Sequence, residues 1–240
     1  MSSTDLTEIW VYLSASPLLG LTLTLVAYTS AYKLYVVCNA NPLLNPVLIS
    51  ATVIISILLV TGTEYQTYFD GAQYIHFLLG PATVALAIPL YQQVSKLKKL
   101  WFPLIVSLLS GVVIGALSSI FIARFFGADL ETQLSIAPKS VTAPIAMGIA
   151  EQLGGLPSLT AALVMLTGIT GALICTRLFA IIGIKDDSVK GIALGVTSHG
   201  IGTARAFQIS DEMGAFSGLA MALSAFATAI ILPWLAQWFF

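Results

Sequence analysis

Charged side chains are scarce in this 240-residue sequence. Asp, Glu, Lys and Arg make up 9% of it, whereas ordinary soluble domains carry roughly a quarter. Hydrophobic residues make up 58%, and the mean hydropathy is +0.94. A soluble fold of this length could not bury so much apolar surface, because folded proteins leave much of their area in water. A lipid bilayer removes that restriction, so the composition predicts an integral membrane protein.

Residues that would indicate other functions are also few. Cys38 and Cys175 stand in apolar stretches without metal-ligand spacing, so we interpret both as packing residues. The net charge is −1 and no basic tract occurs, so we expect no nucleic-acid partner. The sequence contains no G-x-S-x-G, H-E-x-x-H or P-loop motif and no complete dinucleotide fingerprint. We therefore expect neither an enzyme nor a cofactor.

Long apolar stretches dominate what remains. A helix that spans a bilayer needs about 20 mostly apolar residues. The candidate segments are Ile9–Val37, Pro42–Thr61, Tyr74–Val94, Phe102–Phe126, Ile136–Ala150, Leu156–Ile184, Gly191–Ile209 and Ala215–Phe240. Short polar connections join them, and no linker or low-complexity tract separates them. We therefore predict one all-α membrane domain over residues 1–240, a bundle of about eight hydrophobic segments.

Two of these segments are poor simple spans. Ile136–Ala150 is short and contains two prolines and a lysine, and Gly191–Ile209 is rich in glycine and polar residues. Such backbone survives at membrane depth only where protein or a wet cavity covers it, so both segments should be discontinuous or re-entrant and buried. Gly80–Pro89 is a third broken candidate and can be aligned with Ala137–Pro144. That match is compatible with an inverted-repeat transporter.

Charge gives a partial topology. Lys96, Lys98 and Lys99 form the clearest basic loop, which should be cytoplasmic. The loop that contains Lys185 and Lys190 then lies outside if Ile136–Ala150 crosses the membrane, and inside if that segment re-enters and returns. The lysines favour re-entry.

Ionisable groups inside spans are costly and are functional candidates by default. Arg205 lies in an apolar context near Ser198, His199 and Thr203. Its guanidinium could bind a carboxylate through two hydrogen bonds, or it could pair structurally with Glu151. His199 could couple proton flow to transport, or it could hold the broken helix together as a neutral side chain.

A second polar group follows Pro138. Lys139, Ser140 and Thr142 stand where proline favours the first turn of a helix. Free backbone amides at a helix start attract anions, and Lys139 would add a mobile charge. Alternatively, Lys139 extends its charge to the nearby interface.

Four blocks carry a family resemblance across nearly the whole chain. They are NPLLNP at Asn41–Pro46, PATVALAIPLY at Pro81–Tyr91, PKSVTAPIAM at Pro138–Met147 and SHGIGTARAF at Ser198–Phe207. They resemble the LrgB/CidB membrane protein family. The resemblance implies one of two functions: a holin/antiholin-like modulator of murein hydrolase export and autolysis, or a carrier of small monocarboxylates. A domain of the plastid glycolate/glycerate transporter is similar, and bacterial members are linked to pyruvate uptake.

The concentration of polar residues in two broken segments favours the carrier, because a holin-like protein needs no solute site. The predicted substrate is glycolate, glycerate, pyruvate or a similar anion. Its expected ligands are Lys139, Ser140, Thr142, Ser198, His199, Thr203 and Arg205. We expect a multi-pass protein of the bacterial inner membrane, whose flat apolar outer faces permit a homodimer. The resemblance adds a small LrgA/CidA-like membrane protein as a candidate partner.

Overall fold

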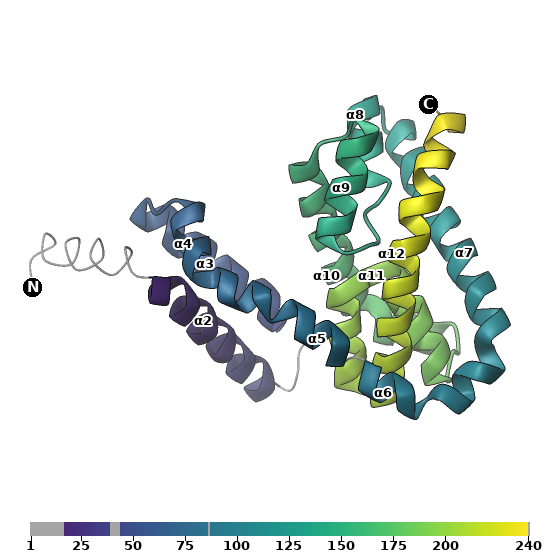
Figure 1. The fold of residues 1–240 in the computed structure, drawn as a ribbon, viewed down its shortest axis with the longest axis horizontal. Coiled ribbons are helices and arrows are strands. Elements are labelled where there is room, and N and C mark those ends of the chain that lie inside the picture. Colours follow the sequence, from purple (N-terminus) through teal and green to yellow (C-terminus); the bar gives the residue numbers. More distant parts are fainter. Residues whose placement is uncertain (1–16, 39–43, 86, 240) are drawn as a thin grey trace, which may run out of the picture. The chain divides into compact units, whose positions relative to one another are not determined.

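The computed structural model describes residues 17–38, 44–85 and 87–239, and every regular element among them is a helix (Figure 1). This confirms the predicted all-α membrane class. The chain divides into two compact units, Met1–Ala85 and Leu86–Phe240, which are described separately below. The single membrane domain expected from the sequence stays a prediction.

The first unit contains α2 (Pro17–Val37), α3 (Pro46–Thr61), α4 (Tyr65–Phe77) and α5 (Leu79–Ala85). The side chain of Asn45 caps α3 by accepting hydrogen bonds from the amides of Val47 and Leu48 at 2.9 and 3.4 Å. Asn45 of the NPLLNP block is therefore a helix cap, whereas Asn41 and Pro42 lie outside the described residues. Thr24 Oγ1 and the Tyr68 hydroxyl are 2.7 Å apart and join α2 to α4.

The second unit contains all the helices that are long and apolar enough to cross a membrane by themselves. Within the described residues there are three: α7 (Val94–Phe125), α10 (Pro157–Ile181) and α12 (Asp211–Phe239). They correspond to three of the eight predicted segments. The remaining elements of this unit are α6 (Ala87–Gln92), α8 (Leu130–Ile136), α9 (Ala143–Leu153) and α11 (Asp187–Ile209). Gly80–Pro89 is divided between α5 and α6, and the repeat inferred from it stays a prediction.

Helix α11 is a hairpin rather than a rod. The hydroxyl of Ser210, just after its last residue, donates to Asp187 Oδ2, at its first residue, over 2.8 Å. A straight helix of 23 residues would hold these ends roughly 33 Å apart at 1.5 Å per residue. The reversal lies at His199, where the backbone is non-helical with a φ of 40° and a ψ of −134°. We call α11 the second hairpin, because another hairpin precedes it in the chain, and we call His199 its tip.

Helices α8 and α9 form a first hairpin. Ser135, in the last turn of α8, binds the start of α10: its Oγ accepts from the Leu156 amide at 2.7 Å, and its carbonyl accepts from Thr160 Oγ1 at 2.9 Å. The 11 residues of α9 would carry the chain about 15 Å away if it continued in one direction. The chain therefore turns back within residues 137–142, which are non-helical and form the tip (Figure 1). Ile136–Ala150 therefore turns back on itself in the structure, and its re-entry in a membrane stays a prediction.

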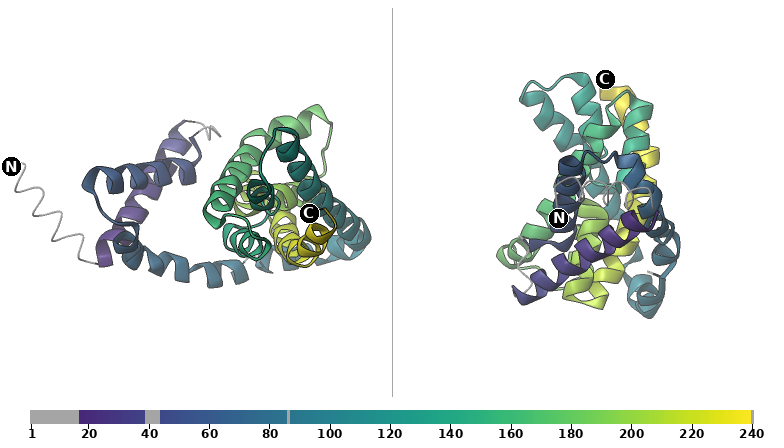
Figure 2. Two further views of the ribbon diagram at one scale, coloured as in Figure 1. Left: turned by 90° about the horizontal axis from the view of Figure 1, so that it is seen from above. Right: turned by 90° about the vertical axis from the view of Figure 1, so that its left-hand side faces the viewer.

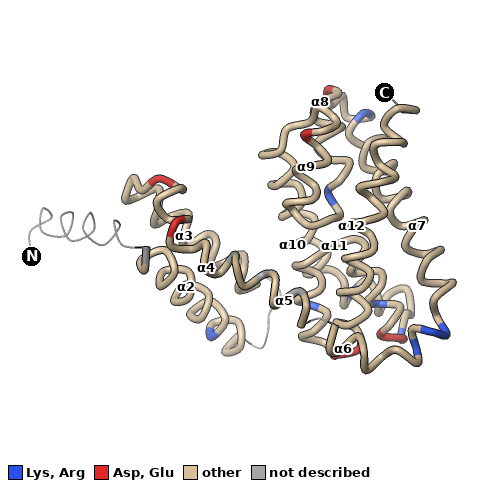
Figure 3. Tube along the Cα trace, viewed as in Figure 1, with Lys and Arg blue, Asp and Glu red and all other residues tan. Residues whose placement is uncertain are grey.

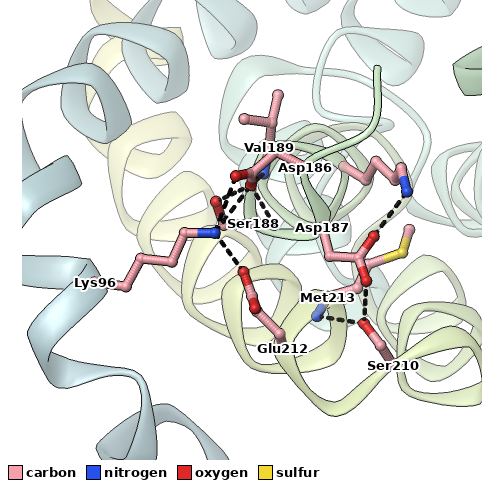
Figure 4. Close-up of polar contacts among 9 residues, drawn as sticks. Lys96, Asp186, Asp187, Ser188, Val189, Ser210, Glu212 and Met213 are labelled. Carbon is pink, nitrogen blue, oxygen red and sulfur yellow. Dashed lines mark hydrogen bonds and ion pairs between the residues drawn. The ribbon is translucent and has the colours of Figure 1, made fainter. Parts of the chain in front are cut away.

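The two hairpins enter the unit from opposite ends. Lys96 Nζ, in the first turn of α7, binds Asp186 just before α11 at 3.0 Å and Glu212 in the first turn of α12 at 2.6 Å (Figure 4). We call this end the lysine end. At the opposite end the rings of Phe121 and Phe239 join α7 to α12, with centroids 5.8 Å apart. Figure 3 shows that most charged residues of this unit gather toward these two ends.

Asp186 stabilises the base of the second hairpin. Its carboxylate accepts hydrogen bonds from the Ser188 hydroxyl and amide, as an N-terminal cap of α11. The Ser188 hydroxyl and the Lys96 ammonium hold the pKa of Asp186 well below its ordinary value of 3.8. Because the pKa is lowered on folding, this contribution to stability is present above pH 3.8 and is lost only as the pH falls further.

The second hairpin packs closely on α12 and α7. A Cβ at Gly191 or Gly195 would overlap the backbone carbonyls of Met213 or Ser217, so these glycines bring α11 into backbone contact with α12. On the other side, α7 contributes the buried side chains of Leu104, Leu108 and Val112, at the i, i+4 spacing of one helix face. Figure 2 shows the same helices from above, with α12 (yellow) beside α7 (teal).

The hairpin arrangement predicts the sidedness of single cysteines in a protein without Cys38 and Cys175. Cysteines at the exposed positions Lys98 and Lys185 should be labelled by an impermeant thiol reagent from the same side, because the lysine end contains both. The positive-inside rule makes that side cytoplasmic. A cysteine at Glu131 should be labelled from the other side.

Two results would contradict this topology. Labelling of positions 98 and 185 from opposite sides would mean that the first hairpin crosses the membrane. Labelling of both from outside would invert the whole orientation.

Candidate functional site

The tips of the two hairpins lie beside one another inside the second unit. His199 Nε2, at the second tip, is 2.9 Å from the carbonyl oxygen of Val164 in α10. Val164 is buried in a cluster with Val141 of the first tip and with Ala146 and Ala225. The second tip lies 12 residues, or about 18 Å, from the lysine end. That depth is near the middle of a hydrocarbon core about 30 Å thick.

A cavity of about 530 Å³ opens between the tips and α10. Lys139 of the first hairpin and Thr197 and Ser198 of the second line it, as do Thr167 and Thr170 of α10. The remaining wall is mostly apolar and is formed by Ile136, Leu163, Leu166, Ile174, Leu178, Phe179 and Leu194, among others. A mostly apolar pocket with a few converging polar groups is the usual form of a small-molecule site.

Lys139 is the charged group of this cavity. Its side chain is half-buried, and Nζ donates to the carbonyl of Gly115 in α7 over 3.3 Å. An ammonium has three N–H donors, so two remain for a bound anion. The sequence left open whether Lys139 binds an anion or extends to the interface, and the structure places it at the cavity.

The hydroxyls around Lys139 are largely engaged with their own helices. Thr167 donates to Leu163 and Thr197 to Ala193, over 2.7 and 2.8 Å. Ser198 is 1% exposed, and its Oγ lies 3.3 Å from Thr197 Oγ1. These oxygens still have acceptor capacity, and rotation would redirect their O–H groups to a ligand.

Glycines of α10 make room for the second tip. A Cβ at Gly171 would overlap the Ser198 hydroxyl, and one at Gly168 would lie 2.7 Å from His199 Cε1. Larger residues at either position would therefore displace the tip from the cavity.

His199 and Thr203 attach the second hairpin to α10 and α12. Both are 4% exposed. Thr203 Oγ1 donates to the His199 carbonyl at 2.8 Å and lies 2.9 Å from Ser217 Oγ of α12. These contacts match the structural alternative for His199. The substrate contact predicted for each stays a prediction.

The other three predicted ligands lie apart from the large cavity's lining. Ser140, at the first tip, lines a much smaller cavity with Val196 and Thr228. Thr142 precedes α9 in extended conformation, without a side-chain capping bond. Arg205 lies on the returning arm of the second hairpin, where Nη1 donates to Gln208 Oε1 at 3.0 Å. Their role as ligands also stays a prediction.

Sequence reasoning missed Thr167 and Thr170. They belong to Leu156–Ile184, which reads as an ordinary apolar span. The signal was the local run TGITG at residues 167–171, which repeats a hydroxyl followed by a glycine every three residues and so places them on one helix face.

These features define the class of the protein: an all-α membrane protein whose second unit combines three candidate spans with two opposed helical hairpins. The chain belongs to the LrgB-like family, whose model matches residues 24–238. No solved structure matches it.

Similar proteins cover nearly the full chain. Holin-like protein CidB of Staphylococcus epidermidis is 35% identical over 229 residues, 95% of this chain and 99% of its own length. Uncharacterized protein YxaC of Bacillus subtilis is 37% identical over 218 residues, 91% of this chain and 94% of its own. Holin-like protein CidB of Staphylococcus aureus is 32% identical over 223 residues, 93% and 97% of the two chains.

The backbone at His199 can be tested by comparing two variants. A φ of 40° is strained for any residue with a Cβ and easy for glycine. Both His199→Ala and His199→Gly remove the imidazole, but only glycine relieves the backbone. We expect His199→Gly to be more stable than His199→Ala by about 1–3 kcal/mol in unfolding measurements on detergent-solubilised protein.

Ala204, in the helical returning arm, provides the matched control. There Ala204→Gly should be destabilising by about 0.5–1 kcal/mol, since glycine weakens a regular helix. If glycine is the poorer residue at both positions, the turn at His199 is not strained as described.

Proposed function

We propose that this protein is a multi-pass carrier of small monocarboxylates in the bacterial inner membrane. The observation that carries the proposal is the position of Lys139: a half-buried ammonium beside a cavity at the meeting point of two hairpins that enter from opposite ends. Charged groups at such depth are costly and typically serve a solute pathway. Opposed broken helices around a mid-depth site are the common architecture of secondary transporters.

The lining suits one small anion rather than a hydrated pore. Lys139 supplies the charge, and Thr167, Thr170, Thr197 and Ser198 supply hydroxyls that can bind a carboxylate or a neighbouring keto or hydroxyl oxygen. The remaining wall is mostly apolar, so it offers few competing hydrogen bonds to the bound group.

A holin-like function is the second candidate. Its support is the name of the two staphylococcal relatives, holin-like protein CidB, which favours this reading more directly than it favours a carrier. On this view the protein modulates murein hydrolase export and autolysis, and the cavity is a packing gap without a solute.

Reconstitution of the purified chain in liposomes separates the two candidates. We expect saturable uptake of labelled glycolate or pyruvate, with a large encapsulated dye retained. Unsaturable release of the dye would support a pore and contradict the carrier. Uptake that appears only after a small second membrane protein is added would show that such a partner is required.

Lys139→Gln tests the site itself. Removing the ammonium should weaken substrate binding on the order of ten- to a hundredfold, since a charge-assisted hydrogen bond contributes roughly 1.5–3 kcal/mol. Uptake is measured against substrate concentration and normalised to the amount of inserted protein. Lys98→Gln is the matched control, because Lys98 is exposed at the lysine end. Equal uptake by the two variants would remove Lys139 from the site.

Arg205→Lys tests the remaining predicted cation. If the planar guanidinium of Arg205 binds the substrate carboxylate through two hydrogen bonds, lysine keeps the charge but loses one of these bonds. We then expect substrate binding to weaken about tenfold or more. Near-normal affinity in the same assay would restrict Arg205 to its contact with Gln208 and leave Lys139 as the cation of the site.

A further inference from the structure

A second cavity lies at the lysine end, separate from the proposed transport site. Its volume is about 320 Å³, within the range of ligand pockets in proteins. Thr176, Phe179 and Ala180 of α10 form one wall, and Ile209 and Met213 form another. Ile184, Lys185 and Lys190 line it from the connection after α10 and the first turn of α11.

The lining divides into an apolar wall and a cationic rim. Lys190 Nζ binds Asp187 Oδ1 at 2.7 Å, and Asp187 also accepts from the Ser210 hydroxyl, so this lysine's charge is balanced within the fold. Lys185 is exposed, and within the described part of the chain it makes no hydrogen bond or ion pair. Lys185 is therefore the rim lysine without a direct acid partner among the described residues, and it lies above apolar side chains.

The position of this cavity identifies the chemistry of its occupant. It extends over the last turns of α10, a candidate membrane span that ends at Ile181, and over the polar connection that follows. That is the depth at which hydrocarbon gives way to lipid headgroups. Basic pockets between spans on the cytoplasmic side bind anionic headgroups.

We propose that this cavity binds one anionic phospholipid. The phosphate lies against Lys185, with Lys190 and its own acid partner beside it, and an acyl chain runs along the exposed lining residues Thr176, Ala180 and Ile209. A free phosphate would make no contact with the apolar wall of the cavity. A zwitterionic lipid has no net negative charge to pair with Lys185. A soluble carboxylate is better served by the cavity around Lys139, which lies deeper.

Three probes distinguish these sources in native mass spectrometry of the detergent-solubilised protein. Dioleoyl-phosphatidylglycerol has both the charge and the chains, dioleoyl-phosphatidylcholine has the same chains without net charge, and glycerol 3-phosphate has the anion alone. We expect the first to be retained and the other two to be lost at matched concentrations. Equal retention of phosphatidylcholine, or binding of glycerol 3-phosphate alone, would overturn the proposal.

Two variants locate the binding. Lys185→Gln should weaken phosphatidylglycerol binding about fivefold, the effect of one lysine at an anionic surface. Ala180→Trp should abolish it by filling the cavity while the charge is kept, and size-exclusion chromatography checks that this variant is folded. Neither variant changes Phe179, which also lines the deeper cavity.

Lys98→Gln is the matched control, because it removes one exposed charge from the same end outside the cavity. It should leave phosphatidylglycerol binding unchanged. Equal weakening by Lys98→Gln and Lys185→Gln would show diffuse attraction to basic residues and would overturn a defined site. Liposome uptake of carboxylate is a separate readout, so failure here does not bear on the transport site.

Discussion

An interrupted helix exposes backbone N–H and C=O groups, and at membrane depth only protein or an enclosed cavity can cover them. The second unit meets this constraint twice, at residues 137–142 and at His199. Val141 of the first interruption and His199 of the second both lie at Val164 of α10. The glycines of α10, the small residues of α11 and the burial of Ser198 and His199 all follow from the need to bring these two tips close to a continuous helix.

Much of this fold could be predicted from residue patterns. Three uniform apolar runs became α7, α10 and α12, because length and hydrophobicity are sufficient to define a span. Proline at 138 and the glycines around His199 located both interruptions. The lysines at 185 and 190 favoured re-entry of the first hairpin, and in the structure they share an end with Lys96.

The site was less predictable, for a physical reason. Which side chain reaches a cavity depends on how hairpin arms are rotated about their axes, and a polar sequence cluster does not encode that rotation. Lys139 and Ser198 line the cavity, but Thr203, in the same cluster as Ser198, turns toward Ser217 of α12. Thr167 and Thr170 of α10 could not be recognised as site residues from the sequence. A threonine hydroxyl can donate to a carbonyl of its own helix, as Thr167 does, so threonine also occurs in ordinary apolar spans.

The hydrogen bond between Asp187 and Ser210 ties both arms of the second hairpin at one neck, beside the ion pairs of Lys96. Mechanically, the hairpin is an arm about 18 Å long that is fixed at its neck, packs along α12 and contacts α10 with its tip. A rotation of only about 10° at the neck would move the tip by about 3 Å over such an arm. That displacement is about one hydrogen-bond length, so a small adjustment at the surface is enough to break the contact between His199 and Val164 in the interior.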